Sequence, residues 1–204
     1  FMTELASEKT LMARSGLQYV TELGPWERKI GGMFGATVKL PSGTYSDDTQ
    51  LRLATSRAIK SNGHFAIQSF AKIELPVWQN YALGAGIGSK YAANCLSKSN
   101  VAWFSNFFES EKTVYINGGG NGAVMRIQPH VWSARDLNNS DAYLLDVIKN
   151  SITTHGHPRA IAGAVFHAQA LVYILQHNRV PTIHNLSEFN TKTLDIPRII
   201  SLDS

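Results

Sequence analysis

The stretch from Pro158 to about Gln176 constrains the fold more than any other feature of the chain, because it is apolar around most of its circumference at the helical repeat. A helix with so little polar surface needs neighbours on most sides, so we expect it to be central and buried. Apolar residues recur at helical spacing in two further groups: Leu51, Ala54, Ala58 and Ile59, and Leu144, Leu145, Ile148 and Ile152. The sequence therefore predicts a domain built from helices.

Strand patterns are scarce by comparison. Only Thr113 to Ile116 reads convincingly as a strand, and one short strand cannot form a sheet that supports a domain. From about Asn178 the helical pattern gives way to a polar segment with two prolines. We therefore predict an all-α helical domain over residues 2–177, followed over residues 178–204 by an irregular tail, a linker or a cut inside a larger domain.

Charge and cysteine content limit the possible functions. The chain has 204 residues and a net charge of +4, and its basic residues are scattered rather than clustered. A small anionic partner fits this pattern better than dedicated nucleic-acid binding, which needs a basic stripe with interleaved aromatics. The single Cys95 excludes an internal disulfide framework and suits a reducing compartment, so we expect a cytoplasmic protein. We expect no membrane partner, because no apolar run approaches the roughly 18 residues that span a bilayer.

The sequence TYSDDTQ, residues 44–50, places two adjacent carboxylates at a predicted helix start. Ser46 or Asp47 can cap a helix that begins near Thr49. Asp48 in the first turn would then interact favourably with the helix dipole. The same side chains also form a compact cluster of oxygen atoms, which suits a hard cation such as Mg²⁺ or Ca²⁺. The local pattern leaves both interpretations open.

A run of glycine and asparagine within VYINGGGNGAVMRIQP, residues 114–129, precedes another predicted helix start. Without Cβ atoms, the backbone can turn sharply and direct amide N–H groups at an anion such as a phosphate. The alternative is a flexible turn. Ordering so many glycines on folding would, however, cost more conformational entropy than a simple connection requires.

This run also imitates nucleotide-binding motifs. Gly118, Gly120 and Ala123 satisfy G-x-G-x-x-A, and Asp141 follows about twenty residues on, as in a dinucleotide-binding fingerprint. However, no second parallel strand is predicted after the helix, and no Gly-Lys-Ser/Thr completes a P-loop. A dinucleotide-dependent enzyme is therefore only a third hypothesis.

TTHGHPRAIAG, residues 153–163, places two histidines ahead of a helix start at Pro158. At that position an imidazole can donate a hydrogen bond to a phosphate or ribose oxygen. His157 can instead be the helix cap, and either histidine can have a purely structural hydrogen-bonding role. A zinc site is less well supported, because no cysteine or third histidine stands at a suitable spacing.

Together these stretches resemble the ADP-ribosylglycohydrolase family, to which the dinitrogenase reductase-activating glycohydrolases are related. The resemblance rests on SDDTQ, GNGAVMRIQP and THGHPRAIAGA, and on LGAGIGSKYAANCL at residues 83–96; it covers about residues 30–175. It implies an orthogonal multi-helix fold, hydrolysis of ADP-ribosyl bonds and Mg²⁺ as cofactor. ADP-ribose or an ADP-ribosylated substrate is then the expected partner, and a nucleic acid is expected only as an ADP-ribosylated target.

The resemblance also assigns site residues. Ser46, Asp47 and Asp48 match the family's ligands for a magnesium pair, and the two aspartates are the expected catalytic residues. By the same resemblance the ADP-ribose site is formed by a glycine-rich loop and one histidine: Gly118, Gly119, Gly120, Asn121, Gly122 and His155.

Two departures from the family bear on activity. The segment from Gly31 to Gly43 has no carboxylate, where the family usually has a Gly-Asp pair and a further acidic residue, and the family's C-terminal Asp-x-Asp-Thr cluster does not occur. We therefore expect at most one firmly held Mg²⁺ and poor hydrolysis by this chain alone. The alternatives are an ADP-ribose-binding module without turnover, or half of a split enzyme. If the chain is the N-terminal part of a longer enzyme, a downstream segment would complete the site. Otherwise the tail of this chain or of a second copy would donate a carboxylate: Glu188, Asp195 or Asp203.

Overall fold

The computed structural model describes residues 7–16, 22–30 and 34–193. By its internal contacts the chain divides into two units, residues 1–46 and 47–204. In the first unit, helix α1 (Glu8–Ser15) begins after Ser7, whose Oγ accepts a hydrogen bond from the amide of Thr10 at 3.2 Å. Strands β1 (Trp26–Ile30) and β2 (Ala36–Leu40) pair as an antiparallel hairpin, with Trp26 opposite Leu40.

This hairpin corrects the prediction that residues 113–116 are the only strand. In the structure Val114 makes just an isolated bridge with Glu109, and Tyr115–Asn117 is a 3-10 turn. The sequence of β2, ATVKL, does alternate apolar and polar residues, and this signal was missed. Its partner β1, WERKI, shows no such alternation, and residues 36–39 of β2 are all exposed, so the hairpin lacks the half-buried face that usually accompanies the pattern.

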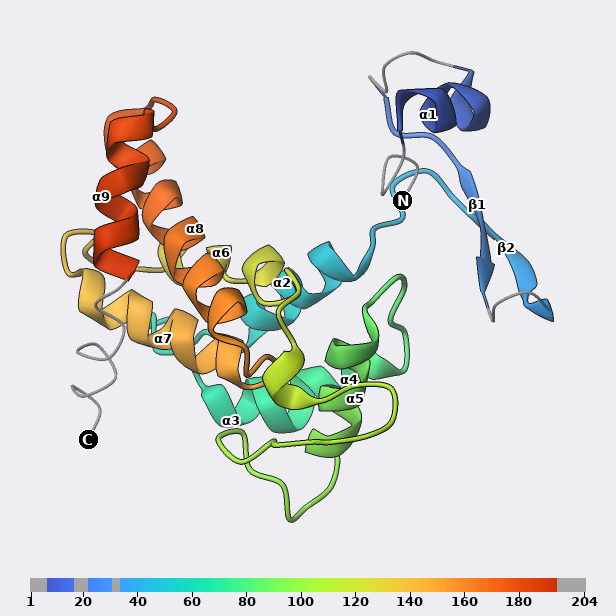
Figure 1. Ribbon diagram of the computed structural model, residues 1–204, viewed down its shortest axis with the longest axis horizontal. Coiled ribbons are helices and arrows are strands. Elements are labelled where there is room, and N and C mark those ends of the chain that lie inside the picture. Colours follow the sequence, from blue (N-terminus) through green and yellow to red (C-terminus); the bar gives the residue numbers. More distant parts are fainter. Residues whose placement is uncertain (1–6, 17–21, 31–33, 194–204) are drawn as a thin grey trace. The chain divides into compact units, whose positions relative to one another are not determined.

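The second unit is built from helices (Figure 1), which confirms the predicted all-α class. A π-helical turn (Phe70–Glu74) joins two of them, α3 and α4. The helices are α2 (Asp47–Arg57), α3 (Ile67–Ser69), α4 (Leu75–Gln79), α5 (Ile87–Leu96), α6 (Gln128–Trp132), α7 (Ser140–Ile152), α8 (Pro158–His177) and α9 (Ile183–Thr193).

Helix α8 is the central helix of this unit, as its apolar composition predicted. It packs against α6, α7 and α9, and its residues Ala164, Val165 and Ala168 are fully buried. Among the described residues, α8 is also the one helix long and apolar enough to cross a membrane, although the sequence led us to expect no such stretch. This is weak evidence for a membrane span, because the core helix of a globular protein passes the same test.

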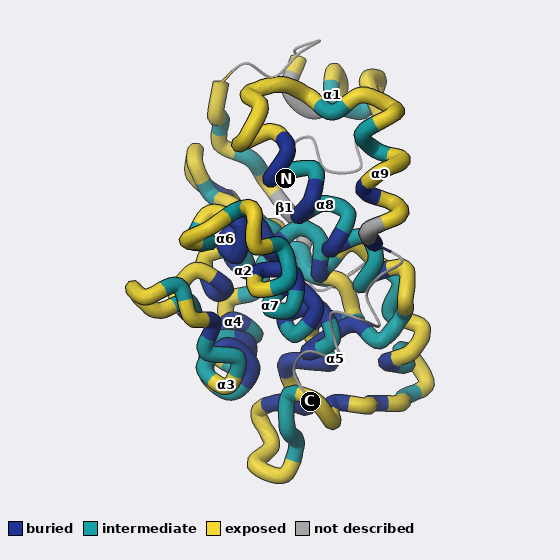
Figure 2. Tube along the Cα trace, turned by 90° about the vertical axis from the view of Figure 1, so that its left-hand side faces the viewer, coloured by how far each residue is buried: buried dark blue, intermediate teal, exposed yellow. Residues whose placement is uncertain are grey.

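Two apolar cores lie on either side of a short 3-10 turn, Val124–Arg126. The first core joins α6, α7 and α8 and includes Ile127 and Val165. The second joins α2 to α5 and includes Leu51 and Phe70. The 3-10 turn contacts both α2 and α8, and Figure 2 shows the buried stretches of these helices in the interior of the unit. The segment that follows the glycine-rich run is therefore fixed between the two cores.

Part of the segment predicted as an irregular tail is helical. Helix α9 packs on α8, and the Phe189 ring is 5% exposed with its centroid 5.8 Å from that of Tyr173. The prediction of irregular chain is therefore wrong for residues 183–193. Asp195 and Asp203 lie outside the described residues.

Candidate functional site

The glycine loop (Gly118–Gly122) lies against the turn that joins α7 to α8. A Cβ atom placed on Gly122 would be 2.9 Å from His155 Nε2, and one placed on Gly119 would be 3.3 Å from His157 Cγ. At Gly122 a side chain could fit only if the imidazole moved. The structure thus brings together the two stretches to which the sequence assigned ADP-ribose binding.

Three consecutive amides of the glycine loop are available to a ligand. The amides of Gly118 and Gly119 donate to backbone carbonyls at 3.1 and 2.8 Å. In the described part of the chain, by contrast, the amides of Gly120, Asn121 and Gly122 meet no acceptor. A Cβ atom on Gly120 would have nothing within 4 Å, so the loop faces open space there. Successive free N–H groups of this kind form an anion-binding concavity.

The helix start predicted after this loop is absent. The loop runs instead into the 3-10 turn Val124–Arg126 and then into α6, which has five residues. Such short segments sum few peptide dipoles. An anion at the loop would therefore be held by individual amides rather than by a helix dipole.

His155 and His157 have different roles. His157 Nδ1 accepts a hydrogen bond from the Arg159 amide at 3.0 Å, which makes it the N-cap of α8, one of the alternatives that the sequence left open. His155 is 5% exposed, and its Nδ1 lies 2.6 Å from Thr154 Oγ1. Burial, helped by the nearby Arg126 charge, lowers the pKa of His155 to about 3, so its imidazole is neutral near pH 7.

Arg126 joins the glycine loop to residues 153–157, the histidine turn between α7 and α8, although no role was predicted for it from the sequence. Its guanidinium is fully buried and donates to Gly122 O at 3.0 Å, to Asn150 Oδ1 at 2.7 Å and to Thr154 Oγ1 at 2.8 Å. Burial lowers its pKa to about 9, which leaves it charged near neutral pH. An arginine between apolar residues in AVMRIQP was the available signal, because a buried cation must have polar partners.

The network continues from Asn150 toward α2. Asn150 Nδ2 donates to Thr55 Oγ1 and to His130 Nε2, each at 3.1 Å. Asn150 and Thr55 are both 0% exposed. The turn before α8, the glycine loop and α2 are therefore connected by buried hydrogen bonds, so these elements hold one another in register.

The predicted metal ligands lie at the start of α2. Asp47 and Asp48 both occupy its first turn, and Asp47 is 6% exposed with its amide donating to Leu83 O at 2.9 Å. One turn on, Arg52 donates to Met125 O at 3.2 Å, which places α2 beside the segment that follows the glycine loop. Ser46 belongs by its contacts to the first unit, so its role as a ligand stays a prediction.

The donor set suits one hydrated Mg²⁺ better than a pair of ions. Two adjacent carboxylates are the hard oxygen ligands that Mg²⁺ prefers, and Mg²⁺ commonly keeps several waters. Within the described ranges, however, no three side chains of His, Cys, Asp or Glu gather as a metal site. The described residues therefore supply no further carboxylates for a second ion.

A comparison with protein-family models decides the family. The ADP-ribosylglycohydrolase model matches residues 2–198, which includes α9 and all of the first unit except Phe1. The chain belongs to the ADP-ribosylglycohydrolase family. Members of this family hydrolyse ADP-ribosyl bonds and typically depend on Mg²⁺. A search of curated proteins found no match to the chain.

Family membership leaves no support for the dinucleotide-binding fingerprint. Gly118, Gly120 and Ala123 lead into a 3-10 turn, and Asp141 lies in the first turn of α7. The fingerprint requires a parallel βαβ unit, whereas the described strands form a single antiparallel hairpin in the first unit. We therefore abandon this hypothesis.

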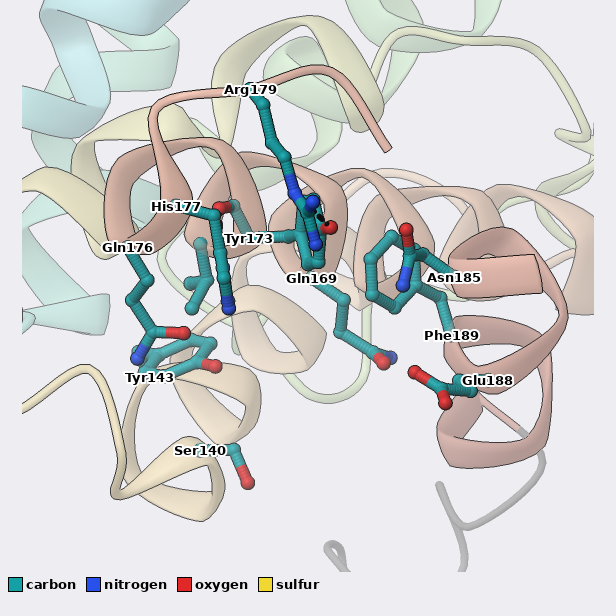
Figure 3. Close-up of a pocket in the computed structure, with 11 residues that line it drawn as sticks. Ser140, Tyr143, Gln169, Tyr173, Gln176, His177, Arg179, Asn185, Glu188 and Phe189 are labelled. Atoms are coloured by element: carbon teal, nitrogen blue, oxygen red, sulfur yellow. Dashed lines mark hydrogen bonds between the residues drawn. The ribbon is translucent and has the colours of Figure 1, made fainter. Parts of the chain in front are cut away.

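Glu188, proposed above as a donor from the tail, lies in a different cavity. This pocket of about 320 Å³ lies between α7, α8 and α9. Its lining residues include Gln169, Tyr173 and Arg179 (Figure 3). Gln169 follows Pro158 by three helical turns of α8, or roughly 16 Å at 1.5 Å per residue. Within one chain, Glu188 is thus near the end of α8 that is remote from His155.

Proposed function

We propose that this chain is an ADP-ribosyl hydrolase domain that binds ADP-ribose between the glycine loop and His155. The observation that supports the proposal is the group of unpaired amides at Gly120, Asn121 and Gly122, beside a buried neutral imidazole. A diphosphate carries oxygen atoms that accept from successive amides, and a ribose offers hydroxyl oxygens to an imidazole N–H.

Each part of the site has a distinct task in this proposal. The amides of the glycine loop bind the diphosphate, and Gly120 leaves the space for its approach. His155 donates a hydrogen bond to a phosphate or distal ribose oxygen, and it does so as a neutral group because burial lowers its pKa. Arg126 holds the loop and the histidine turn at a fixed separation through Gly122 O and Thr154 Oγ1. The ligand then meets donors that are already oriented.

Asp47 and Asp48 would hold Mg²⁺ in this proposal. A bound Mg²⁺ supplies stabilisation of negative charge and an ordered water near the scissile bond. The carboxylates themselves can accept a proton from water or stabilise an electron-poor sugar carbon. Arg52 Nε donates to Gln128 Oε1 at 3.1 Å, which fixes α2 against α6, the helix that follows the glycine loop.

The metal assignment predicts that millimolar Mg²⁺ raises the melting temperature of the wild-type chain, since an ion that binds only the folded state stabilises it by mass action. Asp48→Ala should abolish this response. Asp136→Ala, which removes an exposed carboxylate from a loop of the same unit, should keep it. If the two aspartates act only as helix-start residues, Asp48→Ala instead lowers stability by about 1 kcal/mol with no metal dependence. Thermal melts with and without Mg²⁺ distinguish these outcomes.

A second candidate function is recognition of ADP-ribose without turnover. It is favoured by the small number of carboxylates near Asp47 and Asp48, because the described residues contain no three-residue metal group. Arginine- and serine-linked ADP-ribosylated substrates separate the candidates when incubated with the chain and Mg²⁺. Release of ADP-ribose that Asp48→Ala eliminates supports the hydrolase. Saturable ADP-ribose binding without release supports the binding module.

A further inference from the structure

Arg126 donates a hydrogen bond to the hydroxyl of Thr154 in the histidine turn. Its Nη2 lies 2.8 Å from Thr154 Oγ1. A guanidinium has only N–H donors, so the hydroxyl oxygen must be the acceptor in this contact. Thr154 is 1% exposed, so it has little access to water. Its hydroxyl proton must therefore find an acceptor inside the protein.

His155 Nδ1 is the acceptor available to that proton, at 2.6 Å from Thr154 Oγ1. If Nδ1 carried a hydrogen instead, it would donate to Oγ1, and the buried hydroxyl proton would meet no acceptor among the described residues. A buried O–H group without a partner is strongly disfavoured. The pattern therefore leaves Nδ1 unprotonated, and the neutral ring carries its hydrogen on Nε2.

The other ring nitrogen faces the glycine loop. Nε2 lies next to Gly122, where a Cβ atom would be 2.9 Å from it and equally close to Ser89 Oγ. Nε2 itself makes no hydrogen bond to any described residue. An Nε2–H at this position is a donor beside Gly122, one of the three consecutive loop residues whose amides meet no acceptor in the described part of the chain.

We propose that Thr154 is a positioning residue that, held by Arg126, fixes His155 as the Nε2–H tautomer and so presents a single N–H donor to an oxygen of the bound ADP-ribose. The identity of the ligand as ADP-ribose rests on the proposed function, whereas the tautomer assigned to His155 does not. Burial keeps the imidazole uncharged near neutral pH, which is the state in which the choice of tautomer matters.

Nitrogen-15 NMR of the ligand-free protein tests the tautomer directly. In the wild type we expect His155 to show a protonated Nε2 and an Nδ1 that is shifted by a hydrogen-bond donor. In Thr154→Val, which keeps the shape but lacks the hydroxyl, the Nδ1 resonance should move to the value of an imine nitrogen without a donor. Thr154→Ser restores the hydroxyl and should restore the wild-type resonance. If Thr154→Val does not fold, the wild-type and Thr154→Ser spectra still decide the tautomer.

A wild-type spectrum with hydrogen on Nδ1, or an Nδ1 resonance that Thr154→Val leaves unchanged, would overturn the proposal. ADP-ribose titration provides the second measurement. We expect Thr154→Val to weaken binding about tenfold and Thr154→Ser to change it by less than about threefold. Equal affinity for ADP-ribose in wild type and Thr154→Val would show that Thr154 does not position His155 for ligand binding. The predicted tautomer in a chain that binds no ADP-ribose would uphold the role of Thr154 and refute the proposed function.

Discussion

Replacing Gly156 with alanine should lower the free energy of unfolding by about 3 kcal/mol, at the upper end of what overpacking usually causes. The new Cβ atom would overlap the Tyr115 ring, with Cζ at 2.9 Å. The ring cannot easily move away, because Tyr115 Oη donates to Ile152 O at 2.6 Å and Tyr115 O accepts from the Gly156 amide at 3.1 Å. Urea unfolding followed by circular dichroism measures the loss.

Gly120→Ala is the matched control for this change. It adds the same methyl group to a glycine in the neighbouring glycine loop, where no atom lies within 4 Å of the new Cβ. We expect its free energy of unfolding to differ from wild type by less than about 1 kcal/mol. Similar losses in the two variants would show that the close packing of Tyr115 on Gly156 does not stabilise the turn before α8.

The second large effect is a loss of stability as the pH falls below about 6.5, the ordinary pKa of histidine. Burial lowers the pKa of both His130 and His155 to about 3, with the Arg126 charge as the smaller cause. Between these values the unfolded chain binds protons that the folded chain does not. The free energy of unfolding therefore decreases as the pH falls, by on the order of 1 kcal/mol per pH unit for each histidine.

Urea unfolding at pH 7.5, 6 and 5 measures this dependence in a range above the ordinary pKa values of carboxyl groups. His130→Gln should remove somewhat less than half of the slope, because it removes one of the two buried imidazoles while burial also lowers the pKa of the half-buried His167. His184→Gln, at a side chain that is 84% exposed, is the control and should keep the slope. Stability that does not change between pH 7.5 and 5 in the wild type would contradict the burial of two neutral histidines.

The sequence predicted the helical class because the dominant signal was hydrophobic periodicity. The α8 region is apolar over most of its surface, and α2 and α7 each present an apolar face, so local pattern and tertiary packing agree. Hydrophobic periodicity did not predict the structure where tertiary packing determines it. Residues 113–116 are β-branched and aromatic, yet Tyr115 turns inward to pack on Gly156. In α9 it is Phe189 that docks on α8, and the polar residues around it concealed the helix.

The candidate site could be proposed where residues are unusual in themselves and not where they act through partners. The glycine loop was proposed from its glycine content, and His155 was chosen over His157 by the family resemblance; both assignments stay predictions. Arg126, Asn150 and Thr154 were missed, because their roles depend on contacts between residues 24 and 28 positions apart in the chain. Such contacts leave no local pattern.

Calorimetric titration of ADP-ribose into the wild-type chain and Gly120→Val tests the central claim most directly. A branched side chain at Gly120 extends into the open space beside the free amides of the glycine loop, where a Cβ atom would have no protein atom within 4 Å. We predict saturable binding to the wild type, weakened at least about tenfold in Gly120→Val, with both proteins folded by thermal melting. Equal affinity in the two proteins, or no binding of ADP-ribose by the folded wild type, would contradict the account.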